Sequence, residues 1–357
     1  MNNSISFKKR LALNIFKKYR KTEASLHELQ YLFWECTLRC NLKCIHCGSD
    51  CKQDFTEPEM PFKDFIKVTS EIRKQYNPNN IMIVFTGGEP LIRKDLELCG
   101  EELLKQGYNW GMVTNGVLLS EKRLLSLIDS GLSSVTISLD GFEENHNWMR
   151  NSICFNDVIK AIKMLVKQKR IIFDVVTCVN KKNIHELSEL KKYLISIEVK
   201  KWRLFTISPI GRAKNNPELL ISNSQLKMLL DFIKNSRQEN EIQVSYECEG
   251  FVGKYEMEVR NNYFFCRAGI NIASILSDGS ISACPNIDRQ FSQGNIYKNN
   301  FLEIWNNQFE IMRNRKWMKN DICLKCNVFK WCEGNGFHLR DYDSKKVLMC
   351  QYKMLNE

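Results

Sequence analysis

Three cysteines near the N-terminus, Cys40, Cys44 and Cys47, are the residues best suited to do chemistry in this sequence. Three residues and then two separate them, so one short loop offers three thiolates. Three thiolates suffice to hold a cubane iron–sulfur cluster, and they leave one iron without a protein ligand. An open coordination position is typical of a catalytic metal centre. The spacing predicts such a cluster, and the alternative is a zinc site completed by His46 or Cys51.

Cysteine is unusually abundant, with 15 residues in a chain of 357, and many of these cysteines are clustered. A disulfide framework is typical of small secreted domains, whereas this chain is large and its sequence predicts no signal peptide and no membrane span. We therefore expect a cytosolic protein that uses clustered thiols for metal. The formal net charge of +11 would suit an anionic partner, but no nucleic-acid-binding motif accompanies it.

The elements that must position the triad are predicted from Tyr31 to about Arg237, where short apolar runs alternate with amphipathic runs. The runs rich in Val, Ile and aromatics predict buried parallel strands. They are 31–36, 81–86, 111–114, 134–139, 171–179 and 202–207. Runs with helical periodicity lie between and after them, at 62–75, 96–106, 121–130, 157–168, 184–195 and 224–236. Ser120 is expected to cap the third helix, and Asn183 with Glu186 is typical of a capping box.

Six strand–helix repeats predict an α/β fold, a partial (β/α)6 barrel, followed by a small Cys-rich α+β domain. Ligands in such barrels bind at the carboxyl ends of the strands. The triad follows the first strand, Gly87–Pro90 the second, 114–116 the third and 140–141 the fourth. The unusual residues therefore share one rim. We divide the chain into a basic segment 1–28, a core barrel 29–238 and a cluster domain 239–357.

The triad together with Gly87-Gly88-Glu89-Pro90 resembles the signature of the radical S-adenosylmethionine (radical SAM) enzymes. The resemblance implies that S-adenosylmethionine chelates the open iron of a [4Fe–4S] cluster. It also implies reductive cleavage to a 5′-deoxyadenosyl radical, with electrons from a reductant such as flavodoxin or ferredoxin.

The same resemblance assigns cofactor-binding positions. Gly87, Gly88, Glu89 and Pro90 match the family motif in which the carboxylate pairs with the cofactor's ammonium group. Ser138 and Arg150 match positions that contact its ribose and carboxylate, and His46 stands where an aromatic residue near adenine is usual. Asn115 and Asp140 are interpreted as turn caps. No general base can be assigned.

A second cysteine set resembles the SPASM extension of radical SAM peptide and protein maturases. Cys323, Cys326, Cys332 and Cys350 form a complete four-thiolate set for an auxiliary cluster, with zinc as the alternative. A second, inner cluster would use Cys266 and Cys284, but Gly336 stands where the extension normally has a further cysteine. The inner site is then absent, a [2Fe–2S] cluster, or completed by a residue such as Cys248 or His338.

The opening segment also resembles radical SAM enzymes that are encoded beside small lipoproteins in Bacteroidetes-like bacteria. That resemblance implies a peptide or protein substrate, such as a lipoprotein precursor. Pro285 replaces the aspartate of sulfatase-maturing relatives, which disfavours that activity. The alternative function is radical SAM chemistry on a small-molecule cofactor precursor such as a tetrapyrrole. A non-catalytic scaffold is the third alternative.

The basic N-terminal segment could form a helix in which Phe7, Leu11, Ile15 and Phe16 share one face. It could lie on an anionic membrane or hold a precursor. The expectation we favour is a first helix that closes the bottom of the barrel.

Overall fold

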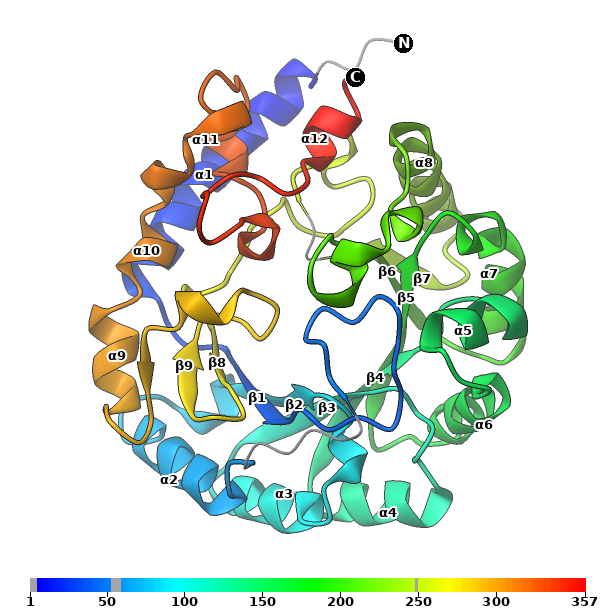
Figure 1. The fold of residues 1–357 in the computed structure, drawn as a ribbon, viewed down its shortest axis with the longest axis vertical. Coiled ribbons are helices and arrows are strands. Elements are labelled where there is room, and N and C mark those ends of the chain that lie inside the picture. Colours follow the sequence, from blue (N-terminus) through cyan, green and yellow to red (C-terminus); the bar gives the residue numbers. More distant parts are fainter. Residues whose placement is uncertain (1–4, 53–58, 248–249) are drawn as a thin grey trace.

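The computed structural model describes residues 5–52, 59–247 and 250–357 of the chain. Its ten-stranded sheet has the order β10-β9-β8-β1-β2-β3-β4-β5-β6-β7. From β8 to β7 each neighbouring pair is parallel, and β9 and β10 extend the sheet antiparallel beyond β8. The sheet curves around an interior, with helices on its outer side (Figure 1). This is the α/β partial barrel that the repeats predicted.

The six strands and six helices predicted from the repeats are present within a few residues of their predicted bounds, whereas the helix at 143–150 and the strand at 243–246 were not predicted. The strands are β1 (Tyr31–Thr37), β2 (Met82–Gly87), β3 (Asn109–Thr114), β4 (Leu132–Ser138), β5 (Ile172–Val179), β6 (Lys201–Thr206), β7 (Gln243–Tyr246) and β8 (Ile272–Ile275). The barrel helices are α2 (Phe62–Ile72), α3 (Leu96–Lys105), α4 (Glu121–Asp129), α5 (Glu143–Arg150), α6 (Phe155–Val166), α7 (Leu187–Ser196) and α8 (Asn223–Glu239).

Large aromatic side chains fill the layer between the sheet and the helices. Trp34 of β1 stacks on Phe65 of α2 with ring centroids 4.5 Å apart. Phe85 of β2 stacks on Trp110 of β3 at 4.9 Å. All four are fully buried. Because strand side chains alternate between faces, packing Trp34 outward turns its neighbour Glu35 into the barrel interior. The apolar pattern thereby places polar groups inside the barrel.

The C-terminal segment continues the barrel sheet at both edges. Here β7 pairs with β6, and β8 pairs with β1. A hairpin joins β8 to β9 (Ser280–Ser282), with Gly279 in its turn at φ +83°. The backbone N–H and the hydroxyl of Ser277 donate to Glu35 at 3.2 and 3.0 Å, so the hairpin is bonded to the barrel interior. Beyond it lie β10 (Gly294–Asn295), α9 (Phe301–Asn307), α10 (Glu310–Arg313), α11 (Phe329–Cys332) and α12 (Gln351–Met354).

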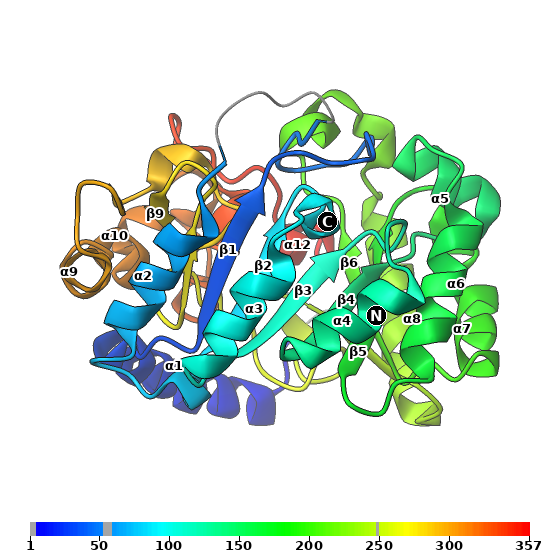
Figure 2. The same cartoon turned by 90° about the horizontal axis from the view of Figure 1, so that it is seen from below.

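The basic N-terminal segment forms the helix α1 (Phe7–Leu26). It lies at the end of the barrel opposite the loop that follows β1 (Figure 2). Its packing partner is the C-terminal segment, because Trp331 of α11 donates to Asn14 at 2.8 Å and Arg20 pairs with Glu333 at 3.1 Å. The helix that we expected to close the bottom of the barrel is therefore held there by contacts with α11 of the C-terminal segment.

The helix-end signals were only partly correct. Ser120 caps α4 by accepting from the backbone N–H of Arg123 at 3.2 Å, as predicted. The capping box of Asn183 and Glu186 is not formed, because both side chains bond elsewhere. The Asn183 amide donates to the carbonyl of Asp140 at 2.8 Å, and Glu186 accepts from the backbone N–H of Phe142 at 3.1 Å. Tertiary partners displaced a local bond.

Candidate functional site

The cysteine triad lies on the loop after β1, at the carboxyl end of the parallel strands. The loop carries a small apolar cluster in which Cys40 and Cys44 are buried beside Leu38, Leu42, Cys51 and Cys154, with Cys47 packed against it. Cys154 had no predicted role, and Cys51 was considered only as a fourth ligand of the alternative zinc site. Their positions bring two further thiols next to the triad.

The Gly87-Gly88 pair of the motif is required by close backbone approach to this loop. A Cβ on Gly87, where φ is +123°, would lie 2.1 Å from the carbonyl oxygen of Thr37. A Cβ on Gly88 would lie 1.9 Å from the carbonyl oxygen of Arg39. The backbone N–H of Gly88 instead donates to Thr37 at 2.7 Å, and that of Glu89 to Arg39 at 3.0 Å. The motif thus positions the start of the cysteine loop.

The carboxylate of Glu89 is fixed by three hydrogen bonds. It accepts from the hydroxyl of Thr114 at 2.7 Å, from the backbone N–H of Asn115 at 2.8 Å and from that of Leu91 at 3.1 Å. Burial raises the pKa of Glu89, although these donors and Arg150 act to lower it. A carboxylate has about four acceptor positions, so one remains for an ammonium group. The arrangement fits the role that the motif implied.

A second clamp on the loop comes from residues after β6, which sequence reasoning missed. Arg212 donates to the carbonyls of Cys44 and Cys51 at 2.7 and 2.9 Å and pairs with Asp50 at 2.8 Å. Its own backbone N–H donates to the carbonyl of Cys47 at 2.9 Å. Four bonds from one residue hold the loop to the far side of the barrel. No local pattern signals this, because the partners are about 160 residues apart.

A buried ion pair lies beside Cys44. Asp140 is fully buried and Arg150 is 7% exposed, and their charged groups are 2.6 Å apart. Arg150 also donates to the sulfur of Cys44 at 3.7 Å. Burial acts to raise the pKa of Asp140, but Arg150, followed by His46 and His146, holds it below its usual value. Asp140 is therefore more than the turn cap that we expected.

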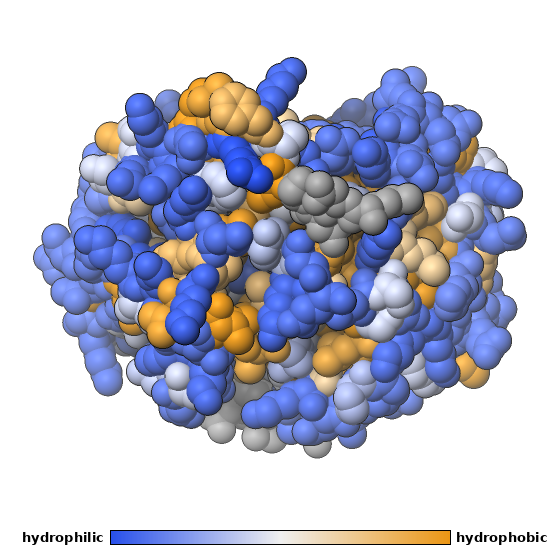
Figure 3. Space-filling model, turned by 90° about the horizontal axis from the view of Figure 1, so that it is seen from above, coloured by the Kyte–Doolittle hydropathy of each residue, from blue (hydrophilic) through white to orange (hydrophobic). Residues whose placement is uncertain are grey.

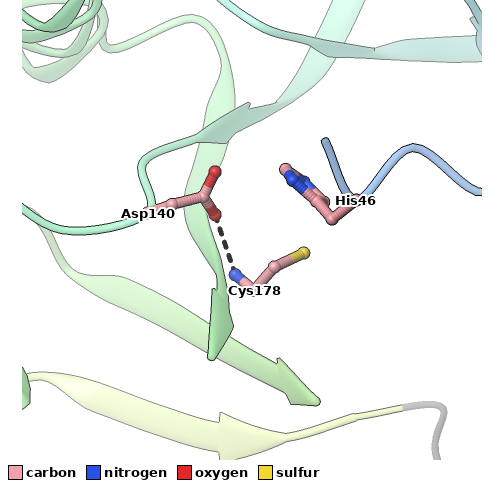
Figure 4. Close-up of side chains that lie close together, drawn as sticks. All are labelled: His46, Asp140 and Cys178. Atoms are coloured by element: carbon pink, nitrogen blue, oxygen red, sulfur yellow. Dashed lines mark hydrogen bonds between the residues drawn. The ribbon is translucent and has the colours of Figure 1, made fainter. Parts of the chain in front are cut away.

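His46 faces Asp140 from the cysteine loop, and Cys178 faces it from β5 (Figure 4). The backbone N–H of Cys178 donates to Asp140 at 2.9 Å. Burial lowers the pKa of His46 to about 4, and its Nδ1 is buried without a hydrogen-bond partner among the described residues. A neutral ring with a free nitrogen suits a polar ligand in this interior. The predicted residues His46 and Arg150 are thus brought together with Cys44.

One close group of possible metal ligands lies beside the triad. Across the described residues, the group of three metal-ligand side chains whose ligand atoms all lie within 4.8 Å of one another is His46, Asp140 and Cys178. Arg150 already pairs with that carboxylate, which disfavours a cation there. Neither cysteine set is gathered this closely, although tetrahedral zinc with bonds of ~2.3 Å would bring its sulfurs within about 4 Å. A cubane does not require this, because each of its thiolates binds a different iron.

The thiols of the triad differ in acidity before any metal binds. Burial raises the pKa of Cys40 to about 11 and also raises that of Cys44. A hydrogen bond from the thiol of Cys51 lowers the pKa of Cys47 to about 6.

The remaining predicted positions near the triad are also placed. Ser138 ends β4 and is half-buried, on the strand face opposite the buried Ile137. Pro90 starts a short 3-10 helix that leads away from the site. Cys36 is fully buried and donates to the carbonyl of Thr86 at 3.3 Å, so it is part of the sheet core.

The four-cysteine set is assembled in the C-terminal segment. Cys323 and Cys332 are buried, and Cys326 and Cys350 are half-buried. Burial raises the pKa of Cys332, and the charges of Cys350 and Cys323 raise it further, which places these three groups close together. The guanidinium of Arg340 donates to the sulfur of Cys323 at 3.2 Å.

Arg340 is 2% exposed, and its other hydrogen bonds go to backbone carbonyls and to the amide oxygen of Asn320. A buried guanidinium needs a nearby negative charge. Thiolates at this site would supply it. The donor set therefore fits an anionic cluster of four cysteines.

The predicted inner cluster site, with Cys266 and Cys284, has fewer cysteine ligands than the four-cysteine set. The sulfur of Cys266 accepts from the backbone N–H of Phe337 at 3.4 Å, so position 336 lies beside it. That position is Gly336, with extended backbone. Among the described parts of the chain, Cys266 and Cys284 do not form a group with a third metal-ligand side chain in which all ligand atoms lie within 4.8 Å of one another. Cys248 lies outside the described residues.

Comparison with known proteins agrees with this geometry. Residues 34–194 match the family model of the Radical SAM superfamily. Residues 266–327 match the model of the SPASM iron–sulfur cluster-binding domain.

Relatives extend the match over most of the chain. Fe-coproporphyrin III synthase of Methanosarcina barkeri is 25% identical over 85% of this chain and 82% of its own length. PqqA peptide cyclase of Bradyrhizobium diazoefficiens is 23% identical over 96% and 91%. A solved structure of anSMEcpe with bound AdoMet and Cp18Cys peptide superposes with a TM-score of 0.72 at 21% identity, over 92% of this chain and 94% of that one.

The fold and the cysteine sites define an iron–sulfur enzyme of the barrel type. The chain contains a radical SAM domain and a SPASM domain. Its cofactors are accordingly S-adenosylmethionine, a [4Fe–4S] cluster and auxiliary iron–sulfur centres of the SPASM domain.

Proposed function

We propose that this radical SAM enzyme abstracts a hydrogen atom from a peptide or protein substrate. Cys40, Cys44 and Cys47 hold the cluster that binds S-adenosylmethionine. Cys323, Cys326, Cys332 and Cys350 hold an auxiliary cluster. When bound and reduced, the first cluster with its cofactor supplies a 5′-deoxyadenosyl radical.

The chain's own residues bind and orient the cofactor. The free acceptor position of Glu89 takes the ammonium group, and the Gly87-Gly88 backbone leaves room for close approach. The unpartnered Nδ1 of His46 and the hydroxyl of Ser138 offer hydrogen bonds to the adenosine part. Arg212 keeps the cysteine loop in place. The buried surroundings of Cys40 and Cys44 exclude water.

The observation that supports a polypeptide substrate is the pairing of arginines on the strands of the sheet and on the segments that follow these strands. Six arginines on these strands and loops are each within 2.9 Å of, or in direct contact with, a carboxylate of the chain. The pairs are Arg39 with Glu59, Arg93 with Asp95, Arg150 with Asp140, Arg203 with Asp174, Arg212 with Asp50 and Arg289 with Glu35. The guanidinium group of arginine is the usual partner of carboxylates, including the propionate groups of a porphyrin. Here they are already engaged, which supports a substrate less acidic than a porphyrin with propionate groups.

The second candidate is chemistry on a tetrapyrrole, because Fe-coproporphyrin III synthase is among the relatives over most of the chain. PqqA peptide cyclase is a relative over a similar length, so sequence similarity alone does not choose between the two substrates.

The test uses the reconstituted, dithionite-reduced holoenzyme with S-adenosylmethionine. Small polypeptides encoded in the flanking reading frames are co-expressed or added, and iron-coproporphyrin III is offered in a parallel reaction. We expect 5′-deoxyadenosine and a peptide mass change that requires the enzyme. A variant with alanine at Cys40, Cys44 and Cys47 should give neither. Porphyrin decarboxylation without any peptide change would overturn the peptide proposal while leaving the radical chemistry intact.

A further inference from the structure

The helix α1 carries an unusual excess of positive charge. Its cations are Lys8, Lys9, Arg10, Lys17, Lys18, Arg20 and Lys21, and its acid is Glu23. Lys8, Lys18 and Lys21 are exposed. Such a helix presents a strongly basic surface wherever it is not covered.

One face of α1 is fixed to the C-terminal segment. Leu13 and Arg20 are the buried residues of the helix. Arg20 pairs with Glu333 and donates to the carbonyl of Trp331, and Lys9 pairs with Glu258 at 3.3 Å. These contacts hold the helix in one orientation against the protein.

The opposite face exposes large apolar side chains. Phe7 is 84% exposed, Leu11 56% and Ile15 63%, and Tyr19 continues the row at 45%. Successive residues of this row are four apart, so they form one stripe along the helix. Figure 3 views the molecule from the upper edge of Figure 1, where α1, α11 and α12 lie, and it shows hydrophobic side chains among hydrophilic ones on that face. A soluble helix would normally turn such a stripe toward the core.

The stripe lies away from the cysteine triad. Figure 2 shows α1 beneath the barrel, while the loop after β1 lies at the top. A surface bound to α1 would therefore leave the entrance at the carboxyl ends of the strands open. Binding there is compatible with access of a large substrate.

We propose that α1 docks the enzyme onto an anionic lipid surface, lying in the plane of the interface. The apolar stripe would enter the boundary of the acyl chains, and the flanking lysines would contact anionic headgroups. No helix among the described residues is long and apolar enough to span a membrane, so the contact is peripheral. A second copy of the chain is a poor occupant, because a two-fold contact would bring two basic helices face to face. The proposal is independent of the substrate.

The experiment is co-sedimentation of the full-length holoenzyme with vesicles of phosphatidylglycerol and phosphatidylcholine, and with vesicles of phosphatidylcholine alone. We expect binding to the first and little to the second, and loss of binding in 0.5 M NaCl through screening. A variant with serine at Phe7, Leu11 and Ile15 should bind about 100-fold more weakly or worse. A variant with glutamine at Lys8, Lys18 and Lys21 should also bind more weakly.

Matched controls separate the helix from general surface effects. Serine at Leu98, Leu104 and Leu125 removes three exposed apolar residues from α3 and α4, and it should leave vesicle binding unchanged. Circular dichroism and iron content establish that each variant is folded and loaded.

Two results would overturn the proposal. One is equal binding by the α1 serine variant and the wild type. The other is a wild-type dimer in light scattering that the α1 serine variant converts to a monomer, with no vesicle binding by either.

Discussion

The buried pair of Asp140 and Arg150 gives the most quantitative prediction of this structure, because the chain contains a matched exposed pair. Their charged atoms are 2.6 Å apart and their side chains are 0% and 9% exposed. In the exposed pair, Arg170 and Asp129 are 2.9 Å apart with side chains 62% and 69% exposed. Replacing each aspartate by asparagine removes the same charge in two environments.

The environments set the expected magnitudes. At an effective dielectric constant of about 20, the buried pair attracts by roughly 6 kcal/mol before desolvation is counted. Removing one partner strands the other as a buried charge, which costs about 3–5 kcal/mol. The exposed pair is screened by water, so its loss costs about 0.2–1 kcal/mol. Asp140→Asn should therefore destabilise the fold several times more than Asp129→Asn.

Urea unfolding of the metal-free, reduced protein, followed by tryptophan fluorescence, measures both changes. Arg150→Gln and the double variant Asp140→Asn/Arg150→Gln complete a thermodynamic cycle. The double variant should recover part of the loss, since no unpaired charge remains. Equal costs for the two aspartates, or a cycle with a coupling energy near zero, would refute the argument that this pair is a coupled buried unit.

Three further predictions concern the C-terminal cysteines and the buried histidine. Arg340→Gln removes a cation that donates to Cys323, so the reduction potential of the auxiliary cluster should fall by on the order of 60 mV in an EPR-monitored redox titration. An unchanged reduction potential would contradict this prediction. Gly336→Cys places a thiol beside Cys266 and should increase the iron content by up to about four atoms per chain, counted by Mössbauer spectroscopy. An unchanged iron content would show that the inner site needs more than this one ligand. Burial lowers the pKa of His146 to about 4, so at a pH below the unfolded value of ~6.5 the unfolded chain binds a proton that the folded chain does not, and stability falls as the pH drops. His146→Gln should reduce this loss of stability between pH 7 and pH 5 by ~2 kcal/mol. An equal pH dependence of the unfolding free energy in wild type and variant, measured by urea titration, would contradict this prediction.

Much of the fold could be predicted because its signals are local. Strand and helix runs follow from hydrophobic periodicity, and each predicted element is present within a few residues of its bounds. The placement of the triad and of Gly87–Pro90 at one rim follows from the rule that parallel strands share a direction. The family follows from the same short motifs.

Other features depend on residues far apart in the chain. Arg212 clamps the cysteine loop from about 160 residues away, and no spacing in the sequence predicts such a bond. Asp140 resembled a turn cap until Arg150 was placed beside it. The capping box at Asn183 failed because Asp140 offered its amide a better-placed acceptor. Each case is a competition between a local bond and a tertiary one.

The sequence by itself determined the chemistry, since three thiolates on one loop and a glycine-rich carboxylate motif need only short-range spacing. It also determined that a thiol is missing at Gly336. The tertiary structure decided what surrounds that chemistry, namely the paired arginines, the guanidinium at Cys323 and the direction in which α1 turns its apolar stripe. Side-chain charge and exposure depend on which distant segments pack together, and periodicity along one segment does not specify its neighbours.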